Sequence, residues 1–147
     1  MTLVKDLFKV KGSDIWSVAP NASVLEALRV MHEKDIGALL VLESGSLVGI
    51  FSERDFARSI VDTGSCVIDA SVKDYMTTKV YTIAPGNSIE DCMQLMTAKK
   101  IRHLPVMEND RLVGVISIGD VVKELIASQE STISTLENYI EGRGYGQ

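Results

Sequence analysis

Aromatic residues are scarce in this sequence, and so are cysteine and proline. Only 5% of the 147 residues are Phe, Trp or Tyr, and there are two cysteines and three prolines. With so few rings, the core must be aliphatic. Cys66 and Cys92 have no CxxC spacing and few histidines near them in sequence, which argues against a disulfide framework and a zinc site. We expect two reduced thiols that pack as small apolar side chains.

An excess of basic residues and long apolar runs are also missing. The net charge is −5 and the pI is near 5.0, whereas nucleic-acid and anionic-membrane surfaces need a basic face. No apolar run is long enough to span a bilayer, and the N-terminus lacks the pattern of a signal peptide. We therefore expect a cytoplasmic protein without nucleic-acid or membrane partners. A local basic pocket for one phosphate-bearing ligand stays open.

Recognisable catalytic motifs are the third absence. The sequence has no adjacent Ser/His/Asp pattern, and it has no Gly-rich loop with a Lys-Ser/Thr for phosphates. We expect no catalytic residue, no metal and no required cofactor, so the protein is not expected to be an enzyme. His103, next to a strand and a proline, is interpreted as structural, and His32 as facing solvent.

The sequence does contain an internal repeat. A shift of 65 residues places positions 17–55 on 82–120 without a gap, and fourteen of those 39 positions are identical. Further upstream, residues 4–7 match residues 72–75 at an offset of 68. We therefore predict one copy at 1–66, a second at 67–127, and an extension at 128–147. Neither copy is large enough to bury a good core alone, so the two should pack together.

Each copy predicts the same order of elements. Ser23 and Ser88 are candidate helix N-caps, each followed three residues later by an acid, as in a capping box. Two apolar runs separated by a short turn then predict a hairpin, whose first strand is covered on both faces. A Ser-x-x-Asp motif opens a second helix. The unit is thus strand, helix, strand, strand, helix, an α/β fold with helices on one side of a short sheet.

The extension continues the last helix. Apolar residues after Asp120 predict a helix that runs through Ile140 and ends at Gly142, and an apolar stripe exposed there would suggest docking on a second copy of the chain. The final Gly-Arg-Gly-Tyr-Gly-Gln is expected to be a frayed end.

The repeated motifs resemble a known family. The pattern Val-x-Pro-x-x-Ser-Val-x-Glu-Ala, then Ile-Gly-Ala-Leu-Leu-Val and Leu-Val-Gly-Ile-Phe-Ser-Glu-Arg-Asp, resembles the cystathionine-β-synthase (CBS) domain. The resemblance implies a pseudo-twofold tandem pair of β-α-β-β-α repeats of the stand-alone bacterial type, plus the C-terminal helix. It also implies a homodimer, and a cleft between the repeats that holds an adenosine-bearing ligand such as AMP, ADP, ATP, NAD or S-adenosylmethionine.

The two Ser-x-x-Asp motifs are the candidate ligand contacts. A carboxylate can accept both ribose hydroxyls, and a helix N-terminus offers N–H groups to phosphate. Asp55 and Asp120 are therefore candidates for ribose, and Ser52 and Ser117 for phosphate or ribose. From spacing alone, helix caps are the favoured interpretation; the family resemblance reverses that preference.

The resemblance also names the residues around these acids. They would line the adenine slot, the approach to the phosphates and the opposite wall: Ile36, Gly37, Ala38, Ile101, Arg102, His103, Pro105, and Lys11, Gly12, Thr78 and Val80. Candidate phosphate cations are Arg54, Arg58, Lys100, Arg102, His103 and Lys123. Because Gly119 occupies the place of Arg54 in the second copy, the two sites are expected to differ in affinity.

Two functions remain open from the sequence. The first is a regulatory module that senses adenine nucleotides and acts on an unknown protein. The alternative is a structural or partner-binding module without a physiological ligand. A pocket filled by Trp16, Phe51 or Tyr81 would favour the alternative.

Overall fold

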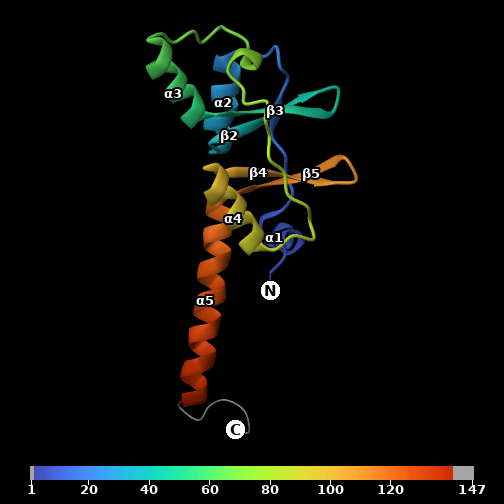
Figure 1. Ribbon diagram of the computed structural model, residues 1–147, viewed down its shortest axis with the longest axis vertical. Coiled ribbons are helices and arrows are strands. Elements are labelled where there is room, and N and C mark those ends of the chain that lie inside the picture. Colours follow the sequence, from blue (N-terminus) through green and yellow to red (C-terminus); the bar gives the residue numbers. More distant parts are fainter. Residues whose placement is uncertain (1, 141–147) are drawn as a thin grey trace. The chain divides into compact units, whose positions relative to one another are not determined.

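The computed structural model describes residues 2–140, apart from the side chains of Lys11 and Tyr139. It divides into two compact units (Figure 1). The first contains residues 13–84 and 105–115 and is called the Asp55 unit here. The second contains residues 2–12, 85–104 and 116–140 and is called the Asp120 unit. Each unit thus combines segments that are far apart in the sequence.

A three-stranded sheet forms the centre of the Asp55 unit. Its strands are β1 (Ser17–Val18), β2 (Ala38–Glu43) and β3 (Ser46–Ser52), in the order β1-β2-β3. β1 runs parallel to β2, and β2 and β3 form the predicted antiparallel hairpin. Three consecutive residues of β2, from Leu39 to Val41, are buried. Since neighbouring strand residues point to opposite faces, both faces of β2 are covered, as predicted.

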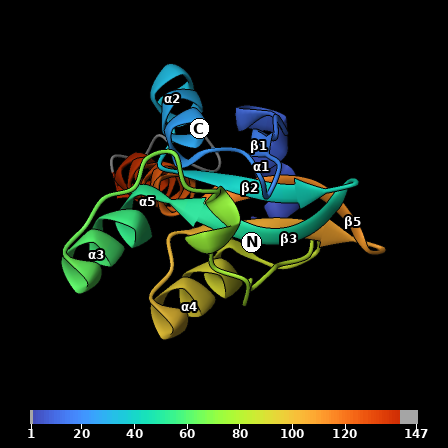
Figure 2. The same cartoon turned by 90° about the horizontal axis from the view of Figure 1, so that it is seen from above.

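Two helices cover this sheet. α2 (Val24–Lys34) and α3 (Glu53–Thr63) lie toward the open end of the β2–β3 hairpin, away from its turn (Figure 2). Their shared core consists of Val24, Ala27, Met31, Leu39, Val41, Phe51, Phe56 and Val72. The ring of Phe56 lies 5.8 Å from that of Phe51 and 5.4 Å from that of Tyr75, between centroids. Three of the eight aromatic residues of the chain therefore gather in one cluster.

Three helices form the body of the Asp120 unit. They are α1 (Val4–Lys11), α4 (Ile89–Lys99) and α5 (Ile118–Ile140), and α5 packs against the other two. α5 confirms the predicted continuation of the last helix as far as Ile140, while the predicted end at Gly142 and the glycine-rich tail lie outside the described residues. None of the helices described is both long and apolar enough to cross a membrane.

The second copy forms its own hairpin, β4 (His103–Glu108) with β5 (Arg111–Ser117). The strand that the repeat predicts before α4 is shorter than the sequence suggests. In place of a strand equivalent to β1, only one parallel bridge remains, between Ile83 and Val106. Its two hydrogen bonds, from Ile83 N–H to Pro105 O and from Met107 N–H to Ile83 O, measure 3.0 and 2.9 Å.

The segment before the second copy docks on the first copy. Residues 70–73, which we call the second lead-in segment, include the start of the short 3-10 helix η1 (Val72–Asp74). Val72 N–H donates to Ala22 O at 2.8 Å, and Lys73 N–H donates to Pro20 O at 2.9 Å. In return, Val24 N–H donates to Ala70 O at 2.9 Å. The start of α2 is thus held by chain that belongs, by sequence, to the other copy.

The segment before the first copy docks on the second copy in the same way. In this first lead-in segment, residues 2–5, Val4 N–H donates to Asn87 O at 2.8 Å and Lys5 N–H to Pro85 O at 3.0 Å. Ile89 N–H donates to Thr2 O at 3.1 Å. The two copies therefore exchange their lead-in segments. The expected copy boundary at 66 and 67 remains a prediction about the sequence repeat, whereas the compact units interleave the copies.

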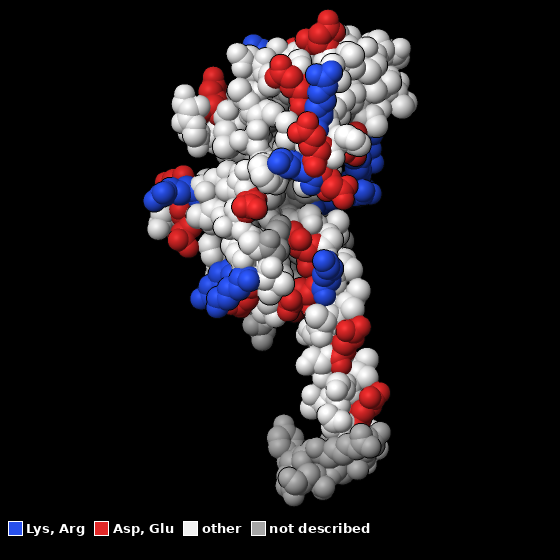
Figure 3. All heavy atoms as spheres, turned by 180° about the vertical axis from the view of Figure 1, so that it is seen from behind, with Lys and Arg blue, Asp and Glu red and all other residues white. Residues whose placement is uncertain are grey.

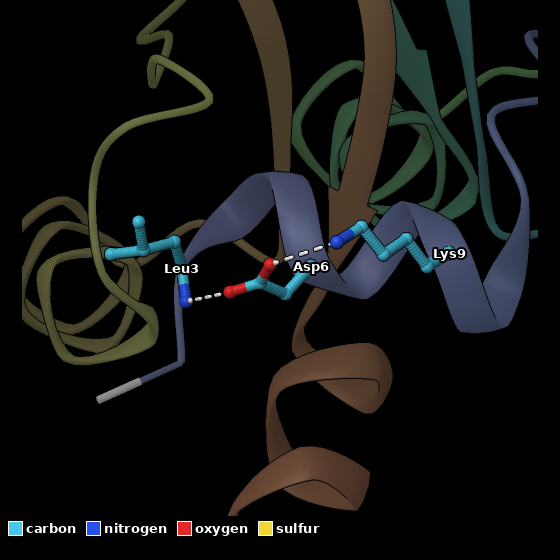
Figure 4. A network of polar contacts seen from close by, with 3 residues as sticks. All are labelled: Leu3, Asp6 and Lys9. Atoms are coloured by element: carbon cyan, nitrogen blue, oxygen red, sulfur yellow. Dashed lines mark hydrogen bonds and ion pairs between the residues drawn. The ribbon is translucent and has the colours of Figure 1, made fainter.

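Helix α1 begins within the first lead-in segment and was not predicted. Leu3 N–H donates to Asp6 Oδ2 at 3.0 Å, and Lys9 Nζ lies 3.7 Å from Asp6 Oδ1 (Figure 4). An acid in the first turn satisfies a free N–H group and favours the helix dipole. On the other side of the helix, Val4 and Leu7 are buried.

Candidate functional site

The start of α3 gathers several of the predicted residues. Ser52 Oγ accepts a hydrogen bond from Asp55 N–H at 3.1 Å, which confirms the serine as an N-cap. Ser52 pairs with Ala38 across the hairpin. Next to this pair, Glu53 N–H donates to Gly37 O at 3.1 Å. The strand entrance and the helix start, separate in the sequence, therefore lie together.

Thr77 joins this group, although the sequence analysis did not single it out. Its hydroxyl donates to Asp55 Oδ2 at 3.2 Å. Its backbone pairs with Ile50 on β3 through hydrogen bonds of 2.8 and 3.0 Å. Thr78 follows directly and is exposed, and Val80 is half-buried. One acid, two hydroxyl groups and a helix N-terminus therefore lie side by side, a combination suited to a sugar hydroxyl and a phosphate.

The start of α5 forms the corresponding arrangement in the Asp120 unit. Ser117 Oγ accepts from Asp120 N–H at 3.2 Å, and Asp120 Oδ2 accepts from Ser117 N–H at 2.8 Å. Ile118 N–H donates to Arg102 O at 2.8 Å, which matches the bond from Glu53 to Gly37 in the other unit. The same two local connections thus recur in both units.

The two acids nevertheless differ. Asp120 closes a reciprocal capping box with its own serine, and one carboxylate oxygen is therefore committed to the helix start. The carboxylate of Asp55 instead accepts from the exposed Thr77 side chain. Identical Ser-x-x-Asp motifs therefore give carboxylates with different partners, a difference that neither motif reveals on its own.

The strand entrances are alike in backbone geometry. Ile36 N–H donates to Met31 O and Ile101 N–H to Met96 O, both at 3.0 Å. The residue before each isoleucine caps the preceding helix in the left-handed conformation, with φ of 53° at Asp35 and 56° at Lys100. The two copies thus turn from helix to strand in the same way, with different side chains.

The structure separates the predicted site residues into two groups. The Asp55 unit contains Ile36, Gly37, Ala38, Ser52, Arg54, Asp55, Thr78, Val80 and Pro105. The Asp120 unit contains Lys11, Gly12, Ile101, Arg102, His103, Ser117 and Asp120. Lys11 ends α1, and its side chain is outside the described part of the structure.

The candidate cations are divided in the same way. Arg54 and Arg58 belong to α3, with Arg54 half-buried and Arg58 exposed. Lys100, Arg102, His103 and Lys123 belong to the Asp120 unit. Figure 3 shows Lys and Arg interspersed with Asp and Glu on the face that it presents. In the part of the chain that the structure describes, no three His, Cys, Asp or Glu side chains form a metal-binding group.

The structure shows neighbours for each of the three bulky side chains that could fill a pocket. Phe51 is fully buried in the core of the Asp55 unit. The ring of Trp16 lies 4.3 Å below Lys34 Nζ, and the ring of Tyr81 lies 5.7 Å from Lys79 Nζ. Each of these rings therefore packs on the protein's own residues.

Two pKa shifts lie at the start of α4. Hydrogen bonds from Ser88 N–H and the Asn87 side chain lower the pKa of Asp91, which confirms the predicted capping box. Burial raises the pKa of the neighbouring Cys92 thiol to about 11, and the charge of Asp91 adds to the effect. Both cysteines are free thiols, Cys92 buried and Cys66 exposed. The hydrogen bonds that lower the pKa of Asp91 also stabilise the start of α4. The raised pKa of Cys92 disfavours the thiolate, which is the reactive form of cysteine.

The family profile of the CBS domain matches residues 4–62 and 72–127. The chain belongs to the CBS domain family. A CBS domain-containing protein from Bacillus subtilis, YhcV, is 33% identical over 138 residues, which cover 94% of this chain and 95% of YhcV. The mitochondrial CBS domain-containing protein CBSX3 of Arabidopsis thaliana is 34% identical over 154 residues, covering 98% of this chain and 74% of CBSX3.

Solved CBS structures confirm the fold. The CBS-domain containing protein ATU1752 from Agrobacterium tumefaciens superposes with a TM-score of 0.80 at 41% identity, over 84% of this chain and 98% of that one. More distant CBS structures carry ligands. CBSX2 was solved in complex with AMP (24% identity, TM-score 0.71), and the MJ0100 CBS pair with 5′-methylthioadenosine and S-adenosyl-L-methionine (23% identity, TM-score 0.71). The predicted tandem pair of CBS repeats with a C-terminal helix is thus confirmed.

Proposed function

We propose that this CBS pair is a regulatory module, not an enzyme, that binds adenosine-containing nucleotides and works as a homodimer. The observation that carries the proposal is the grouping of Asp55, Ser52 and Thr77 with the strand entrance at Gly37. The Asp55 carboxylate accepts a hydrogen bond from the hydroxyl group of the exposed Thr77. It can exchange this donor for a ribose hydroxyl. The AMP complex of the distant CBSX2 structure directs the choice of ligands to test.

The two sites are proposed to bind with unequal affinity. At Asp55, a ligand hydroxyl would replace a neutral, exposed hydroxyl group. At Asp120, it would compete with a backbone N–H group bound at 2.8 Å, which also stabilises the start of α5. The second exchange leaves a helix N–H group unsatisfied or shared, so it is less favourable. We therefore expect the tighter site to be the one with Asp55.

Calorimetric titration with AMP, ADP, ATP and NADH tests the proposal. Replacing Asp55 by Asn removes the charge that strengthens the ribose contact, so the affinity should fall by about 10-fold or more. Asp120→Asn should cost the tighter site little and affect only the weaker binding event. Asp62→Asn, an exposed change on the same helix α3, is the matched control and should bind as the wild type.

Clear results would contradict the proposal. If none of the four nucleotides binds to the wild-type protein, the module acts without such a ligand, as the structural alternative holds. If Asp55→Asn and Asp62→Asn bind equally well, the ligand does not use the carboxylate of Asp55.

A further inference from the structure

The outer part of α5 is left uncovered by the described residues of its own chain. From Ile126 to Ile140, every side chain that the structure describes is exposed. Figure 1 shows α5 continuing well past α1 and α4, the two helices that it packs against. The same stretch is a white and red projection in Figure 3, where uncharged and acidic side chains dominate.

Apolar side chains on this helix follow a regular pattern. They occur at Val122, Ile126, Ile133, Leu136 and Ile140, with Gln129 at the one remaining position. The steps alternate between four and three residues, which is the heptad repeat of a coiled coil. Ile133 and Leu136 are 55% and 57% exposed. The pattern begins on the body of the Asp120 unit and continues along the projecting helix as one stripe.

The composition of this segment favours a helix that needs a partner. Residues 128–135 include three serines, two threonines and one isoleucine, all of which have lower helix propensity than Ala, Leu or Glu. A helix of this length is marginal in water unless a face of it packs against something. In the described part of the chain, each apolar side chain of the stripe is at least 42% exposed. A full cover must therefore come from outside the described residues.

We propose that α5 pairs with the α5 of a second copy, as a parallel two-stranded coiled coil. The stripe places isoleucine at every a position and valine, glutamine and leucine at the d positions. Isoleucine at a with leucine at d favours two parallel strands. The inference rests on the homodimer of the proposed function, and it adds the surface and the direction of the pairing.

The polar position in the stripe favours the parallel direction. In a parallel pair, Gln129 faces the partner's Gln129, and the two amides can hydrogen-bond to each other. In an antiparallel pair, Gln129 faces the partner's Ile133, and its amide would be buried against an apolar side chain. Burying an unpaired amide is costly. A buried polar residue in the stripe can also set the register of a coiled coil, as Asn does at an a position.

The charges beside the stripe agree with this direction. Glu130 and Glu137 occupy e positions, which in a parallel pair lie next to the partner's Leu125 and Thr132. In an antiparallel pair, Glu130 would meet the partner's Glu130, while Lys123 could approach the partner's Glu137. Exposed ion pairs contribute little. The gain at Lys123 therefore does not offset the repulsion at Glu130 and the mismatch at Gln129.

Analytical ultracentrifugation of the full chain tests the pairing. Ile133→Asp places a charge in the centre of the stripe, so the species should fall to half the mass of the wild-type dimer at the same concentration. Ser134→Asp introduces the same residue one position away, off the stripe, and should remain dimeric. Both residues are exposed, so neither change disturbs the core of a unit. If Ile133→Asp stays dimeric, the α5 pairing is overturned while the homodimer stands; a monomeric wild type overturns both.

Disulfide trapping tests the direction. In a Cys66→Ser background, Leu136→Cys should oxidise to a symmetric dimer, because a parallel pair brings the two copies of residue 136 together. An antiparallel pair would give no such bond and would instead join Leu136→Cys to Ile126→Cys when the two variants are mixed. That mixed product, without the symmetric one, would overturn the parallel arrangement. A trimer or tetramer in the centrifuge would overturn the two-stranded one.

Discussion

Gly49 leaves room for the segment that carries Thr77 across β3. A Cβ atom at this position would lie 2.6 Å from Met76 Sδ and 3.0 Å from the backbone oxygen of Thr77. The methionine side chain could move, but the backbone oxygen belongs to the pairing between Thr77 and Ile50. Only a residue without a side chain therefore allows the contact that brings Thr77 to Asp55.

We predict that Gly49→Ala destabilises the protein by about 1–3 kcal/mol, the usual cost of overpacking. Urea unfolding would measure the change in the free energy of unfolding. Gly86→Ala is the control, since a Cβ at Gly86 meets nothing within 4 Å. Equal stabilities of the two variants would mean that the segment at Thr77 shifts freely away from β3.

The two cysteines should differ in reactivity. Cys92 is buried and its pKa is about 11, so the reactive thiolate is rare at pH 8. Cys66 is exposed. Ellman's reagent should therefore titrate one thiol per chain in the native protein and two in urea. Reaction of both thiols at similar native rates would show that the environment of Cys92 opens readily.

Among single helices, α4 starts with a capping box that a third hydrogen bond extends. Ser88 Oγ accepts from Asp91 N–H at 3.1 Å, and Asp91 Oδ2 accepts from Ser88 N–H at 2.9 Å and from Asn87 Nδ2 at 3.1 Å. At the equivalent start of α2, Ser23 Oγ accepts from Glu26 N–H at 3.1 Å. The Asp91 carboxylate therefore contributes more to the start of α4 than the Glu26 carboxylate contributes to the start of α2.

We predict that Asp91→Ala lowers the melting temperature by roughly 2–4 °C at neutral pH. Because the pKa of Asp91 is lowered in the folded state, its charged form stabilises the fold above an ordinary aspartate pKa of about 3.9. This stabilisation is lost as the pH falls below that value, through the folded-state pKa. The difference between variant and wild type should therefore shrink below about pH 4.

Thermal unfolding followed by circular dichroism between pH 3 and 7 measures this effect. Glu26→Ala makes the matched change on α2 and should have a smaller effect. A difference for Asp91→Ala that stays constant down to pH 3 would contradict a role for the charged carboxylate.

Elements with local signals could be predicted from the sequence. Ser23, Ser52 and Ser88 cap helices, and the paired apolar runs that end at Ser52 and Ser117 form hairpins. Caps and short turns depend on neighbouring residues, so both have local signals. α1 was missed because its eight residues span little more than two turns, too short a stretch for an apolar pattern to decide. Its apolar face is covered by residues far along the chain. The bridge at Ile83 is too short for a strand signal.

The candidate site could be predicted only in part for the same reason. Ser52 and Asp55 share one turn of helix, so their spacing shows that they are neighbours. Thr77 lies 22 residues beyond Asp55 and reaches it through the pairing with Ile50. The same Ser-x-x-Asp motif also gives a reciprocal capping box at Asp120 and only the serine cap at Asp55. Such differences depend on contacts between distant segments, which local patterns do not contain.

At the scale of the whole molecule, the first lead-in segment and α1 belong to the core of the Asp120 unit. Leu7 is 5% exposed, whereas Val10, on the same helix, is 86% exposed. We predict that Leu7→Ala costs about 2–5 kcal/mol and that Val10→Ala costs little. Hydrogen exchange in the Leu7→Ala protein should speed up in α4 and the first turns of α5. Equal acceleration in α2 and α3 would show that the two units unfold as one.

Because the lead-in segments are exchanged, each half of the chain completes a helix start in the other half. A polypeptide that carried one copy would have the helix start that receives a lead-in segment, but it could fill that place only with a second molecule. Such an assembly would come apart on dilution, because its stability depends on concentration. Covalent linkage of two copies turns that encounter into an intramolecular one, at an effective concentration that no dilution can lower. A single copy could therefore complete this fold only as an assembly of two molecules. Tandem duplication allows one chain to complete it alone.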